Sequence, residues 1–269
     1  MALKDITLGQ YFPGNSPVHR LDPRTKLICV VLYIVALFLA CWFVTYVIMF
    51  LTLALSVAVS KVPPKSILRG LKPVLFIVVF TAVLNLFYTP GDTALARFWI
   101  FTITLEGVYR AFFMVVRIMM LIAGTFLLTY TTSPILLTDG LESLMGPLKK
   151  IKVPVHELAM MMSIALRFIP TLIEETDKIM SAQKARGADF ESGNLIQKAK
   201  ALIPILVPLF ISAFRRADEL ATAMECRCYH GGEGRTKLHV LKYEGRDYVA
   251  LAIGAMILAG VIALGHFGI

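Results

Sequence analysis

Two arginines that lie 41 residues apart are the side chains of this sequence best suited to recognise another molecule. Residues 176–187 and 217–228 align without a gap, and Arg186 falls on Arg227. A guanidinium is planar and always charged, so it can hold a carboxylate through two parallel hydrogen bonds. Two similar elements on one chain predict two similar binding sites on a partner, which indicates coupling between proteins and not catalysis.

Small residues flank both arginines in the motifs Ala185-Arg186-Gly187 and Cys226-Arg227-Cys228. Gly187 suits the left-handed residue that often follows a helix, and an arginine near a helix C-terminus meets the favourable end of the helix dipole. The alternative is that both arginines are ordinary basic residues at helix ends. We predict instead that the motifs bind a partner through Ala185, Arg186, Gly187, Cys226, Arg227 and Cys228.

The elements that must position these motifs belong to a membrane protein. Hydrophobic residues make up 57% of the 269 residues and charged residues only 17%, whereas about a quarter of a soluble domain is charged. The apolar residues are gathered in long uncharged runs, which predicts an all-α integral membrane protein. The net charge of +9 fits the excess of Lys and Arg in cytoplasmic loops and indicates no nucleic-acid partner.

Charge counting predicts five transmembrane helices. The 33 uncharged residues of 27–59 are too long for one span and slightly short for two. All basic segments fall on one side of the membrane only if this run holds two spans, with a turn near residues 40–42 and Trp42 at the interface. The N-terminus is then cytoplasmic and the C-terminus outside. The remaining spans are expected at about 73–88, 107–131 and 248–267, and the segment 61–72 is expected to be a basic loop.

Residues 132–247 have a different character, since they hold sixteen of the 27 Lys and Arg residues and place apolar residues at helical spacing. The pattern predicts two long amphipathic helices, the second over about 195–225. Proline is expected to kink the first or start a new helix there, and to interrupt the second, at Pro170, Pro204 and Pro208. The predicted domains are an arm with four spans (1–131), a cytoplasmic coupling region (132–247) and a last span (248–269).

A methionine cluster lies in the first amphipathic helix. Methionine is flexible and polarisable, so Met-rich surfaces can repack against several partners. Packing within the helix pair explains the cluster equally well. The candidate contacts for a partner subunit are Met160, Met161 and Met162.

The sequence offers little for chemistry carried out by the chain itself. The nearest resemblance to a phosphate-binding loop, Gly234-Arg235-Thr236, has Arg where Lys is needed, and Tyr229 stands where the first glycine should be. The surrounding glycine-rich stretch 231–234 is therefore expected to be a connector, and ATPase activity in this chain is excluded. Cys226, Cys228 and His230 offer metal ligands, but no paired cluster completes a zinc site.

Arg117 lies near the middle of a predicted span, where a charge is costly and usually faces protein or water. One reading is a contact with a partner span or a substrate path. The other is an internal structural pairing, for instance with Asn85 or a backbone carbonyl. A self-contained secondary transporter would need several such residues and inverted repeats among the spans, and Arg117 alone fits that description.

The residues also resemble a known family. The stretch Pro17-Val18-His19-Arg20-Leu21-Asp22-Pro23-Arg24-Thr25-Lys26-Leu27 is similar to the N-terminal signature of the EcfT family, the transmembrane components of energy-coupling factor (ECF) transporters, a class of ABC importers. Ala165-Leu166-Arg167-Phe168-Ile169-Pro170-Thr171 and the two arginine motifs are similar as well. The second motif departs from the usual Ala-Arg-Gly pattern because Cys stands on both sides of Arg227.

The resemblance implies a four-part importer in a bacterial plasma membrane. Two cytoplasmic ATPases, EcfA-like and EcfA′-like, would carry ATP and Mg²⁺, and each would bind one arginine motif. A separate membrane protein, the S-component, would bind the vitamin or other micronutrient. This chain would hold no cofactor and no catalytic residue, and would transmit the ATPase motion to the S-component.

Overall fold

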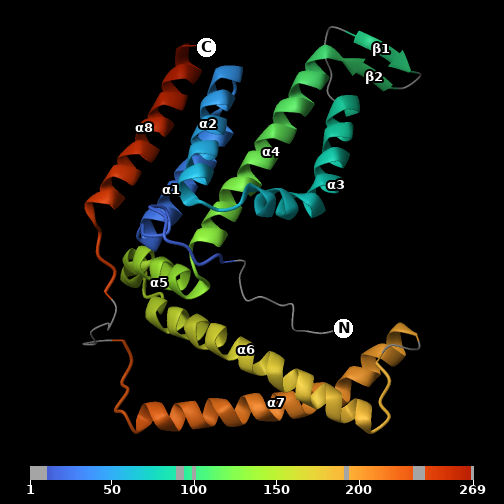
Figure 1. Ribbon diagram of the computed structural model, residues 1–269, viewed down its shortest axis with the longest axis vertical. Coiled ribbons are helices and arrows are strands. Elements are labelled where there is room, and N and C mark those ends of the chain that lie inside the picture. The colour runs from blue at the N-terminus through green and yellow to red at the C-terminus, as the bar shows by residue number, and fades with distance from the viewer. Residues whose placement is uncertain (1–10, 89–93, 99–100, 191–193, 233–239, 268–269) are drawn as a thin grey trace. The chain divides into compact units, whose positions relative to one another are not determined.

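The structure is a computed structural model that describes residues 11–88, 94–98, 101–190, 194–232 and 240–267. The chain divides into two compact units, each described separately below (Figure 1). The bundle unit comprises Gly9–Ser143 and Leu241–Ile269. The insert unit comprises Leu144–Val240 together with Met1–Leu8.

The bundle unit is built from six helices and one hairpin. Strands β1 and β2 pair antiparallel, with Ala94 opposite Thr104 and Phe98 opposite Phe101. This short hairpin is the one departure from the predicted all-α fold, which is otherwise confirmed. The elements are α1 (Pro23–Leu39), α2 (Phe43–Ser60), α3 (Pro64–Tyr88), β1 (Ala94–Phe98), β2 (Phe101–Thr104), α4 (Leu105–Thr131), α5 (Pro134–Leu144) and α8 (Gly245–Phe267).

Local sequence explains where the first two helices begin and end. The Asp22 side chain caps α1 by accepting a 2.9 Å hydrogen bond from the amide of Arg24, and Pro23 occupies the first turn. The uncharged run then breaks between Leu39 and Phe43, where the turn was predicted. Two helices therefore fit into residues 27–59, and each is slightly short for a full span.

Helix α3 begins nine residues earlier than predicted. The basic segment expected as a loop forms the first turns of the helix, which starts at Pro64. Proline is well suited to the first helical position because its missing N–H is not needed there. Pro73, taken as the start of the span, lies inside α3, which bends along its length in Figure 1.

The core of the bundle lies between α1, α2 and α4. Gly124 marks a close approach, because a Cβ atom at this position would lie 2.9 Å from the Tyr33 ring of α1. A side chain at residue 124 would therefore push α1 away from α4. The largest fully buried apolar side chains of the bundle are Leu37, Met49, Val78 and Val261.

Arg117 is held inside the bundle by two hydrogen bonds. Its Nη2 donates to the carbonyl of Ala40 at 2.8 Å, and its Nε donates to the Tyr46 hydroxyl at 2.9 Å. Ala40 caps the C-terminus of α1, so the guanidinium joins the α1–α2 turn to α4. The structural pairing with a backbone carbonyl is confirmed. Asn85 is not its partner, since the Asn85 amide donates to Thr81 and Met114.

Replacing Arg117 with leucine is expected to destabilise the bundle. Two hydrogen bonds to a charged group, each worth roughly 1.5–3 kcal/mol, are lost, and the Ala40 carbonyl loses the guanidinium that it meets. We expect the unfolding midpoint of the purified protein to fall by roughly 5 °C or more. Arg110→Leu is the matched control, because Arg110 is an exposed arginine of the same helix. Equal midpoints for the two variants would contradict this structural role.

The insert unit consists of η2 (Gly146–Ile151), α6 (Val155–Ala185) and α7 (Leu195–Glu225). The two long helices cross (Figure 1). An ion pair of 2.9 Å between Arg216 and Glu175 joins them. Pro204 and Pro208 lie inside a continuous α7, so the predicted interruption is wrong, because a proline removes one backbone hydrogen bond and its neighbours keep theirs. Pro170 likewise lies within a continuous α6, so no new helix begins there.

Six helices of the described residues are long and apolar enough to cross a membrane: α2, α3, α4, α6, α7 and α8. The prediction had five, namely α1 to α4 and α8. Helix α1, with 17 residues, extends about 25 Å and is slightly short. Helices α6 and α7 qualify through their 31-residue length, and their mean hydropathies of 1.3 and 1.5 lie below the 2.1–2.3 of the others. This intermediate hydropathy is typical of amphipathic helices.

Candidate partner-binding site at two helix ends

The two arginine motifs end α6 and α7 with the same backbone turn. In each, the arginine and the two residues after it donate hydrogen bonds to the last turn of the helix. Each bond in α6 has a counterpart 41 residues later in α7. In α6 they run from Arg186 to Gln183 (3.1 Å), Gly187 to Lys184 (3.0 Å) and Ala188 to Gln183 (3.0 Å). In α7 they run from Arg227 to Met224 (3.1 Å), Cys228 to Glu225 (2.9 Å) and Tyr229 to Met224 (3.1 Å).

The residue after each arginine has a left-handed backbone, with φ of 89° at Gly187 and 55° at Cys228. Glycine adopts this conformation freely, whereas a residue with a Cβ atom pays about 1–2 kcal/mol. The second motif therefore keeps the turn of the first at a conformational cost. The preserved turn, and not only the preserved arginine, is what the two motifs share.

Both arginine side chains are available to a partner. Arg186 and Arg227 are exposed, as are Ala185, Gly187, Cys226 and Cys228. Within the described ranges, neither guanidinium forms a hydrogen bond or an ion pair. An exposed guanidinium at the tip of a rigid helix can receive a carboxylate without first breaking a contact.

The crossing of α6 and α7 places the two tips at equal distances from one point. Arg216 follows its ion-pair partner Glu175 by 41 residues, the same spacing as the two motifs. Each arginine lies 11 residues beyond the crossing pair, or about 16 Å along its helix. The insert unit therefore presents two arms of equal length, each ending in an arginine.

The segment after the second motif is anchored to the start of α6. The Tyr229 hydroxyl contacts the Met160 sulfur at 3.1 Å. Gly232 lies against His156, where a Cβ atom would come within 2.5 Å of the ring. Of the glycine-rich connector, Glu233 and Gly234 lie outside the described residues, as does the phosphate-loop look-alike.

The predicted methionine surface is divided between packing and exposure. Met160 is half-buried at its contact with Tyr229, whereas Met161 and Met162 are exposed by 54% and 47%. The two explanations offered for the cluster thus apply to different residues. Met161 and Met162 are the members that can meet a partner.

A larger apolar surface lies on α7. Exposed side chains recur at the i, i+4, i+7 and i+11 positions of one face, and the rings of Phe210 and Phe214 are 4.9 Å apart. The sequence analysis identified this helix as amphipathic but did not single out its residues, although their spacing was the available signal. We call these residues the α7 stripe: Ile203, Val207, Phe210 and Phe214.

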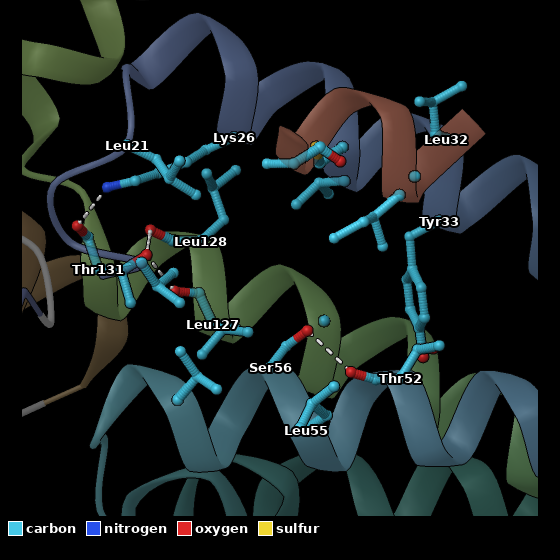
Figure 2. A pocket seen from close by; sticks show the side chains of 18 of the residues that line it. Leu21, Lys26, Leu32, Tyr33, Thr52, Leu55, Ser56, Leu127, Leu128 and Thr131 are labelled. Atoms are coloured by element: carbon cyan, nitrogen blue, oxygen red, sulfur yellow. Dashed lines mark hydrogen bonds between the residues drawn. The ribbon is translucent and has the colours of Figure 1, made fainter. Parts of the chain in front are cut away.

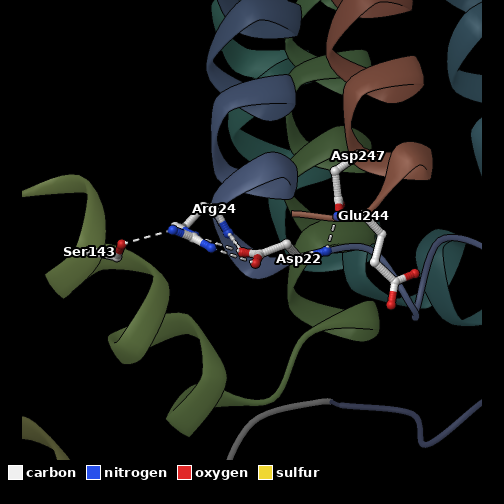
Figure 3. A network of polar contacts seen from close by, with 5 residues as sticks. All are labelled: Asp22, Arg24, Ser143, Glu244 and Asp247. Atoms are coloured by element: carbon white, nitrogen blue, oxygen red, sulfur yellow. Dashed lines mark hydrogen bonds and ion pairs between the residues drawn. The ribbon is translucent and has the colours of Figure 1, made fainter. Parts of the chain in front are cut away.

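In the bundle unit, the N-terminal signature forms a polar network (Figure 3). Asp22 and Arg24 form an ion pair of 2.9 Å whose side chains are 3% and 13% exposed. The Asp247 carboxylate accepts from the amides of Asp22 and Glu244, both at 2.8 Å. The network thus ties the start of α1 to the start of α8.

Arg24 also holds the two places at which the chain passes between the units. Its Nη1 donates to the Ser143 hydroxyl at 3.2 Å, and its guanidinium lies 4.1 Å from the centre of the Tyr243 ring. The chain leaves the bundle unit after Ser143 and returns at Leu241. One arginine near the N-terminus therefore fixes both the exit and the return of the chain.

Comparison with known proteins places the chain in a family. Residues 14–238 match the family model described as "CbiQ: Cobalt transport protein". Relatives described as "Energy-coupling factor transporter transmembrane protein EcfT" are found in Ruminiclostridium cellulolyticum (53% identical, covering 97% of this chain and 98% of that protein), Clostridium kluyveri (57%, 97% and 97%) and Bacillus subtilis (48%, 97% and 98%). This similarity over nearly the full length confirms the resemblance carried by the motifs, and the chain belongs to the EcfT family of transmembrane proteins of energy-coupling factor transporters.

Proposed function

We propose that this chain couples two cytoplasmic ATPase subunits to a separate substrate-binding membrane subunit, and that the assembly imports a vitamin or other micronutrient. The observation that supports this best is the identical backbone turn at the ends of α6 and α7, each presenting an unpaired, exposed arginine. Two equal arms suit two similar ATPases, one for each motif. ATP and Mg²⁺ would be held by those ATPases, and this chain would bind no cofactor.

The crossed helices suit a rigid transmitter. The Arg216–Glu175 ion pair fixes the crossing, and Gln183 of α6 donates to the Pro204 carbonyl of α7 at 3.4 Å. A displacement of either tip would then move both helices together, because their crossing point is held by specific contacts. In this proposal, α6 and α7 lie on the cytoplasmic side and not across the bilayer.

The α7 stripe and the neighbouring methionines give the substrate-binding subunit an apolar surface. Phe210 and Phe214 are exposed by 66% and 59%, which is unusual for aromatic side chains without a partner or a lipid beside them. Met161 and Met162 add an adaptable surface on α6. The bundle unit would span the plasma membrane with its N-terminus in the cytoplasm and its C-terminus outside, as the distribution of Lys and Arg predicts.

Purification of the chain from its native membrane tests this function. The coupling role predicts that two ATPase chains and one further membrane protein are recovered with it. The isolated chain, reconstituted alone, should neither hydrolyse ATP nor accumulate any solute. A self-contained secondary transporter would instead move solute on its own. Recovery without any ATPase, together with transport by the chain alone, would overturn the proposal.

A further inference from the structure

The bundle unit contains a cavity of about 850 Å³ between α1, α2, α4 and α8 (Figure 2). This volume lies at the upper end of the range found for ligand pockets. Most of the lining is aliphatic, from residues such as Leu32, Leu55, Leu128 and Ile253. A cavity of this kind holds water poorly, because water needs several polar partners.

One end of the cavity is polar and the other is apolar. Lys26, Glu244 and Arg246 line the end at which α1 and α8 begin, and Thr131 lines it where α4 ends. Ala36, Gly124 and Ile257 line it further along their helices. Ile257 lies 12 residues beyond the start of α8, so the cavity extends about 18 Å along this helix. That depth is close to one leaflet, half of a hydrocarbon core of about 30 Å.

The polar end matches the headgroup of an amphiphile. The Lys26 ammonium uses its three hydrogens on the carbonyls of His19 and Thr131 and on the Thr132 hydroxyl. Arg246 and Glu244 are both more than half exposed, and their loose pairing of 3.9 Å leaves each able to contact another ion. Asp22, Arg24 and Asp247 lie behind this end but are occupied within their own network.

The hydroxyls along the wall make no demand for a polar ligand. Ser56 donates to the Thr52 carbonyl at 2.8 Å, and Thr52 donates to the Met49 carbonyl at 2.8 Å. The Tyr33 hydroxyl is buried and has no hydrogen-bond partner within the described ranges, so it is the single polar atom facing the apolar half of the cavity without a partner. The wall is therefore suited to hydrocarbon.

We propose that this cavity is a binding site for a glycerophospholipid of the leaflet into which the starts of α1 and α8 project. The acyl chains would fill the apolar depth, and the phosphate would meet Arg246 at the polar end. The assignment rests on the length, the apolar wall and the charged end of the cavity together. It does not depend on the proposed coupling function, since it concerns the bundle unit alone.

Filling the cavity tests the assignment. In Ser56→Phe the ring would occupy the space of the acyl chain, whereas in Thr125→Phe it would not, because Thr125 is not among the lining residues. The two positions are matched, since both are exposed hydroxyl residues that donate to the carbonyl four positions earlier in a helix. The full assembly is purified from its native membrane in mild detergent, and retained phospholipid is counted by native mass spectrometry.

The wild type and Thr125→Phe should each retain a phospholipid, and Ser56→Phe should retain about tenfold less at equal protein. Leu55→Trp, which fills the cavity from a neighbouring position, guards against a folding defect in the first variant and should give the same loss. Equal retention in the wild type and in both filling variants would overturn the assignment. So would a wild-type assembly without retained phospholipid, including one in which a partner helix occupies the cavity.

Discussion

Replacing both Arg186 and Arg227 with alanine is expected to abolish coupled uptake. Each guanidinium is exposed at the end of a helix and, within the described ranges, has no partner in the chain itself. Its contacts would therefore be made with the ATPases. Truncating one member of a buried charge pair at an interface costs about 2–5 kcal/mol, which corresponds to at least tenfold in affinity. Two such losses leave no firm attachment for either ATPase.

The single variants should behave alike, because the two tips have the same turn and the same distance from the helix crossing. Each should lower uptake and the recovery of one ATPase subunit by about tenfold, and the double variant should lose both. The measurements are vitamin uptake by cells and the ATPase subunits that co-purify with the chain.

Arg215→Ala is the matched control for the arginine variants. Arg215 is an exposed arginine on α7, three turns before Arg227 and outside the motif. It should leave both uptake and ATPase recovery close to wild type. Wild-type uptake by the double variant would rule out the arginine tips as the coupling contacts.

The sequence predicted those features that depend on local pattern. The 41-residue repeat indicated two equivalent helix ends, and the structure gives both the same hydrogen bonds. Charge counting required a break near residues 40–42, and the break lies there because two helices share one uncharged run. Periodicity also identified both long helices of the insert unit. Each of these signals is carried by residues close together in the chain.

The start of α3 was predicted wrongly because two signals conflicted. Lys65, Arg69 and Lys72 indicated a loop, and Pro73 indicated a helix start. Basic residues are nevertheless good helix formers, and Pro64 supplies the favoured first residue nine positions earlier. The polarity of the segment therefore reported where it lies relative to the membrane and not whether it is helical.

Contacts between distant residues could not be predicted from spacing. Asp247 accepts from the amide of Asp22 across 225 positions of sequence, and no periodic pattern links the two. The Arg216–Glu175 pair is different, because its partners lie at equivalent positions of the repeat. Once the repeat is known and the two helices are taken to cross, such a pair is a natural candidate for the crossing point.

Arg24→Gln is expected to separate ATP hydrolysis from uptake. Arg24 holds Ser143 and Tyr243, which flank the exit and the return of the chain, and joins both to Asp22 at the start of α1. Glutamine is shorter and neutral, so it cannot hold the three contacts at once. Removing one partner of a buried ion pair costs roughly 3–5 kcal/mol, because Asp22 keeps an uncompensated charge. The insert unit would then remain connected to the bundle only through a loosened exit and return.

The assembled complex distinguishes this transmission role from a general loss of stability. The arginine tips are unchanged in Arg24→Gln, so both ATPases should still co-purify and hydrolyse ATP, while vitamin uptake per ATP falls by about tenfold. Arg246→Gln is the control, because Arg246 is exposed and its pairing with Glu244 is loose at 3.9 Å. It should keep the wild-type ratio of uptake to hydrolysis. If Arg24→Gln kept that ratio too, or if it lost uptake and hydrolysis in equal proportion, the network would stabilise the bundle without carrying motion into it.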